Sequence, residues 1–89
     1  MQTIPNRLRR CRRSRGLSQK EVAEILGLKD ASMISRWENG QGMPSMLNAF
    51  KLALVYRIWT DTLYTDLLAS LKGEIQKRED ALAQRQHHA

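Results

Sequence analysis

Helix start and stop signals follow one another so closely in this chain that its first half can fold only into short helices. Gly16, Gly27 and Gly40 each end a segment whose apolar residues recur at helical spacing. Residues 18–21 (Ser-Gln-Lys-Glu) read as a capping box, in which the serine hydroxyl and the glutamate carboxylate accept hydrogen bonds from amides at the start of a helix. No segment alternates between apolar and polar residues as a half-buried strand does. We therefore expect an all-α domain.

The same signals predict where the helices lie. They are expected over residues 4–15, 19–27, 31–39, 45–56 and from about 59 onward. The fourth helix is largely apolar, which predicts a central place in the core for Met46, Leu47, Phe50, Ala53 and Leu54. After Gly73 the composition is mixed in charge, so residues 74–89 are expected to form a fraying helix and tail. This predicts a compact domain over residues 1–72 and a helical extension with a tail over residues 73–89.

The length of the chain and the distribution of its charge limit the functions that it can have. A chain of 89 residues and 10.3 kDa fits one domain and has no room for a large enzyme fold. Seven basic and no acidic residues lie among the first 20, whereas the rest of the chain carries eight basic and nine acidic residues. The excess positive charge is therefore N-terminal. Such a surface attracts a polyanion, and nucleic acid is the first candidate.

Several classes of function find no support in the sequence. The apolar runs are too short to span a membrane or to form the core of a signal peptide, so we expect a cytoplasmic protein without a membrane partner. The single cysteine, Cys11, cannot form an intramolecular disulfide, and no spacing of His and Cys residues suits a metal ion. We expect neither enzymatic activity nor a cofactor.

Two short helices over residues 18–39, joined by a tight turn that contains glycine, form a helix-turn-helix arrangement. At this motif the chain resembles the Xre and phage-repressor (Cro/C1-type) family of helix-turn-helix DNA-binding proteins, over about residues 4–70. The residues that carry the resemblance are Gly-Leu-Ser-Gln at 16–19, Glu-Val-Ala at 21–23, Leu-Gly-Leu at 26–28, Ile-Ser-Arg-Trp-Glu-Asn-Gly at 34–40 and Pro-Ser at 44–45. The resemblance implies a compact five-helix, lambda-repressor-like domain that binds double-stranded DNA and regulates transcription.

Two positions depart from the family pattern. From Gln19 to Glu38 the chain is one residue longer than the commonest family spacing, and the extra residue falls within residues 29–31. The longer turn changes where the third helix begins relative to a DNA groove. Arg57 stands where the family often has glycine, at a helix end that favours a left-handed backbone.

The third helix supplies the residues that would read DNA bases. A major groove admits one α-helix, and short side chains near the start of the helix let its backbone approach the base edges. By resemblance, the base-reading positions are Ala31, Ser32, Met33 and Arg36. Arg36 is the sharpest of them, because a guanidinium can bond both acceptors of a guanine; a phosphate contact or a surface ion pair is the alternative.

Other polar residues are expected at the DNA backbone. Gln19 begins the second helix, where unpaired amides and the helix dipole favour a phosphate oxygen; a solvated glutamine is the alternative. The further phosphate candidates, of which the charged ones could simply form a solvated face, are Lys20, Lys29, Arg10, Arg13, Ser35 and Gln41. By resemblance, Arg12 and Glu38 form a buried ion pair that joins the first helix to the end of the third.

One such domain contacts few base pairs, so useful specificity requires two copies on a pseudo-palindromic site. The fifth helix has more apolar residues than a core needs, which suggests a dimer interface, unless the stripe only closes the core: Tyr64, Leu67, Leu68, Leu71 and Ile75. We therefore expect a homodimeric repressor. Two alternatives stay open. One is the antitoxin of a toxin–antitoxin pair, whose C-terminal segment masks a protein partner, and the other is a protein-interaction module that no longer reads DNA.

Overall fold

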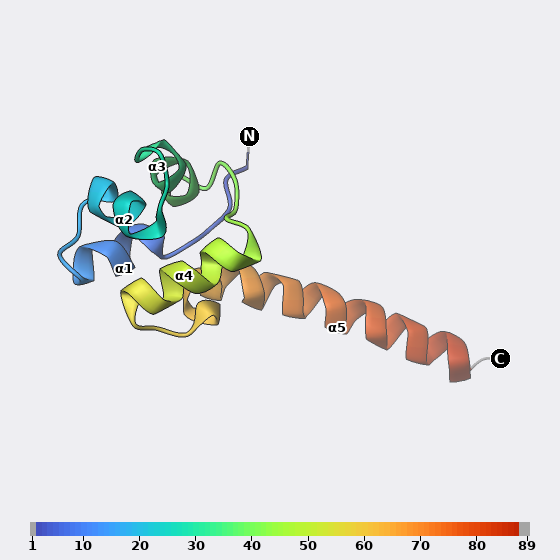
Figure 1. Ribbon diagram of the computed structural model, residues 1–89. Coiled ribbons are helices and arrows are strands. Elements are labelled where there is room, and N and C mark those ends of the chain that lie inside the picture. The colour runs from blue at the N-terminus through green and yellow to red at the C-terminus, as the bar shows by residue number, and fades with distance from the viewer. Residues whose placement is uncertain (1, 88–89) are drawn as a thin grey trace.

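The computed structural model describes residues 2–87, and none of these residues lies in a strand. The elements are α1 (Leu8–Ser14), α2 (Gln19–Leu26), α3 (Ser32–Glu38), α4 (Met46–Tyr56), the 3-10 helix η1 (Thr60–Tyr64) and α5 (Thr65–His87). The predicted all-α fold is confirmed. The first four helices and η1 gather into one body, and α5 extends away from it (Figure 1).

A single core holds the short helices in place. Its buried residues come from α1 to α4 and from η1: Leu8, Val22, Ala23, Leu26, Ile34, Trp37, Leu52, Ala53, Tyr56, Leu63 and Tyr64. α2 packs against both α3 and α4, and α1 packs against α3. Helices of seven or eight residues are unstable alone in water, so this shared packing stabilises α1, α2 and α3.

Capping residues set the ends of α2 and the start of α3. The Ser18 hydroxyl accepts a hydrogen bond from the Glu21 amide at 3.0 Å, and the Glu21 carboxylate accepts one from the Ser18 amide at 2.9 Å, so the predicted capping box is confirmed. Gly27 ends α2 with a φ of 76°. In the lengthened turn, the Asp30 carboxylate accepts hydrogen bonds from the amide and the hydroxyl of Ser32. α3 therefore begins at Ser32, one residue later than expected.

The first helix begins at Leu8, four residues after the expected start, so this boundary was wrong. The preceding residues are not helical, because tertiary hydrogen bonds hold their backbone elsewhere: the Ile4 amide donates to the Gly40 carbonyl at 2.9 Å. The Asn6 side chain then accepts a hydrogen bond from the Leu8 amide at 3.1 Å. This bond satisfies one of the unpaired amides at the start of α1.

α4 begins one residue after the predicted start and ends at Tyr56 as predicted, but most of its predicted core residues are exposed. The exposed ones are Met46, Leu47, Phe50 and Leu54, with exposed fractions that reach 74% for Met46 and 79% for Leu54. Ala53 is buried as predicted, and Leu52 and Tyr56 also face the core. The prediction failed because α4 is apolar around most of its circumference, and spacing alone does not reveal which side such a helix buries.

α5 is one continuous helix from Thr65 to His87, so the predicted helical extension beyond residue 72 is present. The helix passes through Gly73 without a break, and Arg78 pairs with Glu74 at 2.8 Å, a spacing that supports helices. The radius of gyration is 16.9 Å, against about 12 Å for a compact chain of this length, because α5 projects from the body (Figure 1). Residues 88 and 89 of the predicted tail lie outside the described residues.

Arg57 ends α4 in the left-handed conformation, with a φ of 57°. A residue with a side chain costs about 1–2 kcal/mol in this conformation, and replacing it by glycine removes that cost. Part of this gain is lost again, because glycine gives the unfolded chain more conformational freedom. We expect Arg57→Gly to raise the free energy of unfolding by about 0.5–1 kcal/mol in a urea titration, and Arg57→Ala to give no such gain. A lower stability for Arg57→Gly would show that the arginine side chain itself stabilises the turn.

Candidate nucleic-acid interface

α3 divides its residues between the core and a free face. Ile34 and Trp37 are buried, whereas Ser32, Met33 and Arg36 are exposed. Two more of the predicted contact residues, Ala31 and Ser35, are half-buried beside this face. The helix lies at the outer edge of the body (Figure 1). An exposed helix of this kind is what a major groove can accept.

The end of α3 is tied to α1 and α2 through one carboxylate. The Glu38 side chain is only 1% exposed, and Arg12 approaches it with Nε at 2.6 Å and Nη2 at 3.1 Å. Arg9 Nε lies 3.3 Å away, and Gln19 Nε2 donates to the same carboxylate at 3.0 Å. Arg12 also donates to the Leu17 carbonyl at 3.0 Å. We call Glu38 with Arg9, Arg12 and Gln19 the Glu38 cluster.

These contacts keep the Glu38 carboxylate charged. Burial by itself would raise its pKa, but hydrogen bonds from Arg12, Gln19 and Arg9, together with the charge of Arg12, outweigh burial and lower the pKa below its ordinary value. The hydrogen bond to Glu38 likewise raises the pKa of Arg12. Both partners therefore stay ionised at neutral pH.

Gln19, predicted as a phosphate contact, lies at the start of α2 but turns its amide toward Glu38. One of its two amide hydrogens is used in that bond, and the other remains for a second acceptor. The Glu38 cluster therefore fixes the orientation of Gln19 relative to α3. Sequence analysis identified Gln19 and Glu38 separately and did not predict this contact.

Arginines of α1 surround a hollow of about 430 Å³ beside the Glu38 cluster. Its lining residues are Asn6, Arg7, Arg9, Arg10, Arg13, Glu38 and Asp66. Arg10 and Arg13, both predicted, are exposed here. Sequence analysis did not predict the contacts of Arg9 with the end of α3, where its Nη2 lies 2.7 Å from Asn39 Oδ1. Its spacing of three from Arg12 places both on one side of α1, which is the signal that predicts this contact.

The remaining phosphate candidates lie apart from this cluster. Lys20 and Lys29 line a second hollow, of about 490 Å³, together with the acidic Glu24 and Asp30. After α3, the Gln41 amide donates to the Arg36 carbonyl at 3.0 Å, so only the Gln41 side chain can reach a ligand.

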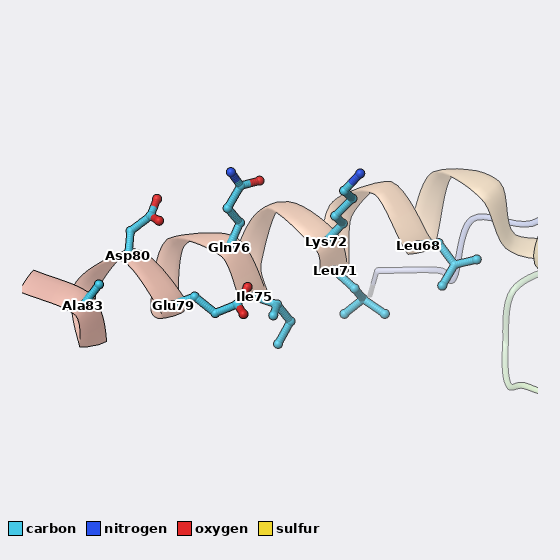
Figure 2. Close-up of a pocket in the computed structure, with 8 residues that line it drawn as sticks. All are labelled: Leu68, Leu71, Lys72, Ile75, Gln76, Glu79, Asp80 and Ala83. Atoms are coloured by element: carbon cyan, nitrogen blue, oxygen red, sulfur yellow. The ribbon is translucent and has the colours of Figure 1, made fainter.

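Four of the five predicted dimer residues line an apolar groove of about 400 Å³ between α4 and α5, together with Met46 and Phe50: Tyr64, Leu67, Leu68 and Leu71. Ile75 is not among its lining residues. Figure 2 shows Leu68, Leu71 and Ile75 on one side of α5, with Lys72 and Gln76 on another. Tyr64 is only 6% exposed and belongs to the core, because η1 packs its side chain inward, which agrees with the alternative that this part of the stripe closes the core. Leu67 is partly buried against the core as well.

The described part of the chain contains neither a cluster of metal-binding side chains nor a helix that could span a membrane. Among the described side chains, those of residues 2–86, no three His, Cys, Asp or Glu residues are grouped to hold a metal ion. No described helix combines the length and the apolar character that crossing a membrane requires.

Comparison with known proteins identifies the family to which this chain belongs. No curated protein and no solved structure matches the chain. A family model described as helix-turn-helix matches residues 8–61, more than half of the chain. The match includes α1 to α4, and with them the exposed α3 and the Glu38 cluster. The lambda-repressor-like fold and DNA as a partner follow from it. The chain belongs to the Cro/C1-type helix-turn-helix family of DNA-binding transcription regulators.

Proposed function

We propose that this regulator is a sequence-specific repressor that binds a pseudo-palindromic operator as a homodimer and acts in the cytoplasm. The observation that carries the proposal is the exposed face of α3, whose far end is anchored by the Glu38 cluster beside the arginines of α1. A helix fixed in this way enters the major groove, while the neighbouring cations meet phosphates. A repressor then needs no further domain, because it acts by occupying its site.

The proposed DNA contacts are of two kinds: some residues on and beside α3 contact bases, and others around them contact phosphates of the DNA backbone. The proposed base-reading residues are Ala31, Ser32, Met33 and Arg36. The proposed phosphate contacts are Gln19, Lys20, Lys29, Arg10, Arg13, Ser35 and Gln41. Among the arginines of α1, Arg10 and Arg13 carry the largest share of the salt dependence, because Arg9 and Arg12 are paired with Glu38.

The homodimer is proposed from the apolar surface of α4 and α5. Met46, Phe50, Leu68 and Leu71 are exposed around one groove, and Ile75 continues the stripe along α5. A contiguous exposed apolar surface on a small domain marks an interface. A two-fold symmetric pair would present two copies of α3 to successive turns of one face of DNA.

Selection of bound duplexes from a random DNA pool, at near-physiological salt, tests the proposal directly. We expect an enriched sequence with two-fold symmetry, whose half-sites lie about one helical turn apart. Enrichment of a single asymmetric site would contradict the proposed homodimer and support sequence-specific DNA binding by one copy of the chain. No enrichment, with no binding to any duplex at low salt either, would overturn the proposal in favour of a protein-interaction module.

Arg36→Ala tests the assignment of base reading. If Arg36 bonds a guanine, we expect the variant to lose about 1–3 kcal/mol on the selected site and to accept other bases at one position. Binding to an unrelated duplex should change little. Arg85→Ala, an exposed change far along α5, is the matched control and should bind like the unaltered protein. An equal loss on every duplex would make Arg36 a phosphate contact.

The antitoxin role is a second candidate, favoured by the length of α5 that projects from the body. Ile75 and Leu82 are exposed there, beyond the groove beside α4. In this role the projecting helix would cover a partner protein while α3 binds DNA. Deletion of residues 77–89 separates the two functions: a repressor keeps its operator affinity, and an antitoxin keeps DNA binding but loses its partner.

A further inference from the structure

The chain before α1 is held against the end of α3. Besides the bond from Ile4 to Gly40, the Asn6 amide nitrogen lies 3.1 Å from the Ile4 carbonyl and 3.2 Å and 3.3 Å from those of Trp37 and Glu38. Asn6 thereby bonds carbonyls in the last turn of α3, of which that of Trp37 also accepts a hydrogen bond from the Gly40 amide at 3.1 Å. Figure 1 shows this N-terminal segment running beside the connection between α3 and α4.

Gly40 makes this close approach possible. A Cβ atom on Gly40 would lie 2.5 Å from the Ile4 carbonyl oxygen, 2.8 Å from the Ile4 nitrogen and 3.0 Å from Thr3 Cβ. Its φ of 72° also favours glycine. The position of Thr3 relative to α3 is therefore defined by backbone packing as well as by hydrogen bonds.

This packing forms a hollow of about 500 Å³ beside the last turn of α3, lined by Gln2, Thr3, Ile4, Arg36, Gly40 and Gln41. Its side chains bring a guanidinium, two amides and a hydroxyl, all of which can donate hydrogen bonds. No carboxylate lines it, in contrast to the two hollows beside α1 and α2. A donor-rich hollow without a carboxylate is suited to an anion.

Arg36 reaches this hollow because the loop after α3 leaves room for it. A Cβ atom on Gly42 would lie 3.2 Å from Arg36 Nε, so the guanidinium end lies against the loop. Arg36 stands in the last turn of α3, where a helix in the major groove comes close to the edge of the groove. The phosphates of the DNA backbone lie at that edge, next to the base that Arg36 is proposed to read.

We propose that this hollow binds one phosphate of the DNA backbone, with Gln2 and Thr3 as donors that complement Gln41. Arg36, which is proposed to read a base, lies at the edge of the hollow. The inference rests on the proposed function, since it assumes that α3 docks in a major groove. It adds residues that precede the helix-turn-helix to the DNA-binding surface. Gln2 and Thr3 would also add hydrogen-bond donors beside the loop at residues 41–43, which has no charged residue to bind a phosphate.

The test is the double variant Gln2→Ala/Thr3→Ala, compared with the unaltered full chain and with Ser70→Ala/Gln84→Ala, an exposed pair on α5. Binding is measured on the selected operator and on an unrelated duplex of equal length at one salt concentration. We expect the double variant to lose about tenfold on both duplexes, as two neutral hydrogen bonds would give. The control pair should lose nothing on either duplex.

A second measurement locates the phosphate. Single neutral methylphosphonates are placed along the operator, and we expect one position that weakens the unaltered protein and leaves the double variant unaffected. If the unaltered protein binds the operator and the double variant binds equally well, the hollow is not a phosphate site and the proposed function stands. A loss confined to the selected operator would also overturn the proposal, by making the contact one with a base. If the unaltered protein binds no duplex, the proposed function itself fails.

Discussion

Replacing Glu38 by alanine is expected to lower the free energy of unfolding by about 3–5 kcal/mol, a large part of the stability of a small domain. The carboxylate is 1% exposed and accepts hydrogen bonds from Arg12, Arg9 and Gln19. Arg12 is itself only 12% exposed, so its charge would be left largely desolvated and without a partner. Urea titration followed by circular dichroism measures the loss.

Two further variants separate the loss of charge pairing from a general effect of losing a glutamate. Glu79→Ala removes an exposed carboxylate on α5 and should change stability by less than about 0.5 kcal/mol. In Arg12→Leu/Glu38→Leu both buried charges are absent, so this double variant should be more stable than Glu38→Ala alone. A double variant less stable than Glu38→Ala would show that an unpaired Arg12 charge is not the cause of the loss.

The Glu38 cluster also predicts a dependence on pH. Because the pKa of Glu38 is lowered in the folded protein, the unfolded chain binds a proton first as the pH falls. The stabilisation is therefore complete above the ordinary glutamate pKa of about 4.3 and is lost as the pH falls through the lowered value. Glu38→Gln should flatten the stability curve in this acidic range. An unchanged slope would assign the acid sensitivity to other carboxylates.

Leu68→Glu is expected to raise the Kd of the proposed dimer roughly a thousandfold. A two-fold interface contains each residue twice, so a cost of about 2 kcal/mol per copy becomes about 4 kcal/mol per dimer. Leu68 is 43% exposed in the single chain, so the change should leave the unfolding midpoint in place at concentrations where both proteins are monomeric. Sedimentation across a range of protein concentrations measures the Kd.

Ser70→Glu is the matched control, because it adds the same charge to the same helix away from the apolar stripe. It should dimerise like the unaltered protein. Two results would contradict the proposed interface: an unaltered protein that stays monomeric at all concentrations, or a Leu68→Glu variant that dimerises with unchanged Kd.

Local signals predicted the helix-turn-helix well. The capping box at Ser18 and the left-handed glycine at position 27 act through neighbouring residues, so the sequence alone contains the information. The spacing of Ile34 and Trp37 identified the buried side of α3 for the same reason, and left Arg36 on its exposed side. These elements place the candidate DNA-binding face.

Contacts between distant segments were not predictable in this way. The start of α1 depends on Gly40, which is more than 30 residues away, and the burial of Tyr64 depends on how η1 packs. The apolar residues of α4 illustrate the same difficulty, since Leu54 and Leu52 look equally suited to a core. The contacts of Arg9 and Gln19 with Glu38 depend on how three helices pack, so neighbouring residues in the sequence do not reveal them.

The apolar surface on α4 and α5 determines how the proposed repressor would respond to its own abundance. Below the Kd of the dimer, the concentration of dimers rises with the square of the total protein concentration. A twofold change in synthesis then changes the concentration of DNA-binding dimers about fourfold. The steepness of the dose–response curve would therefore be set by residues such as Phe50 and Leu71, which lie on helices other than α3.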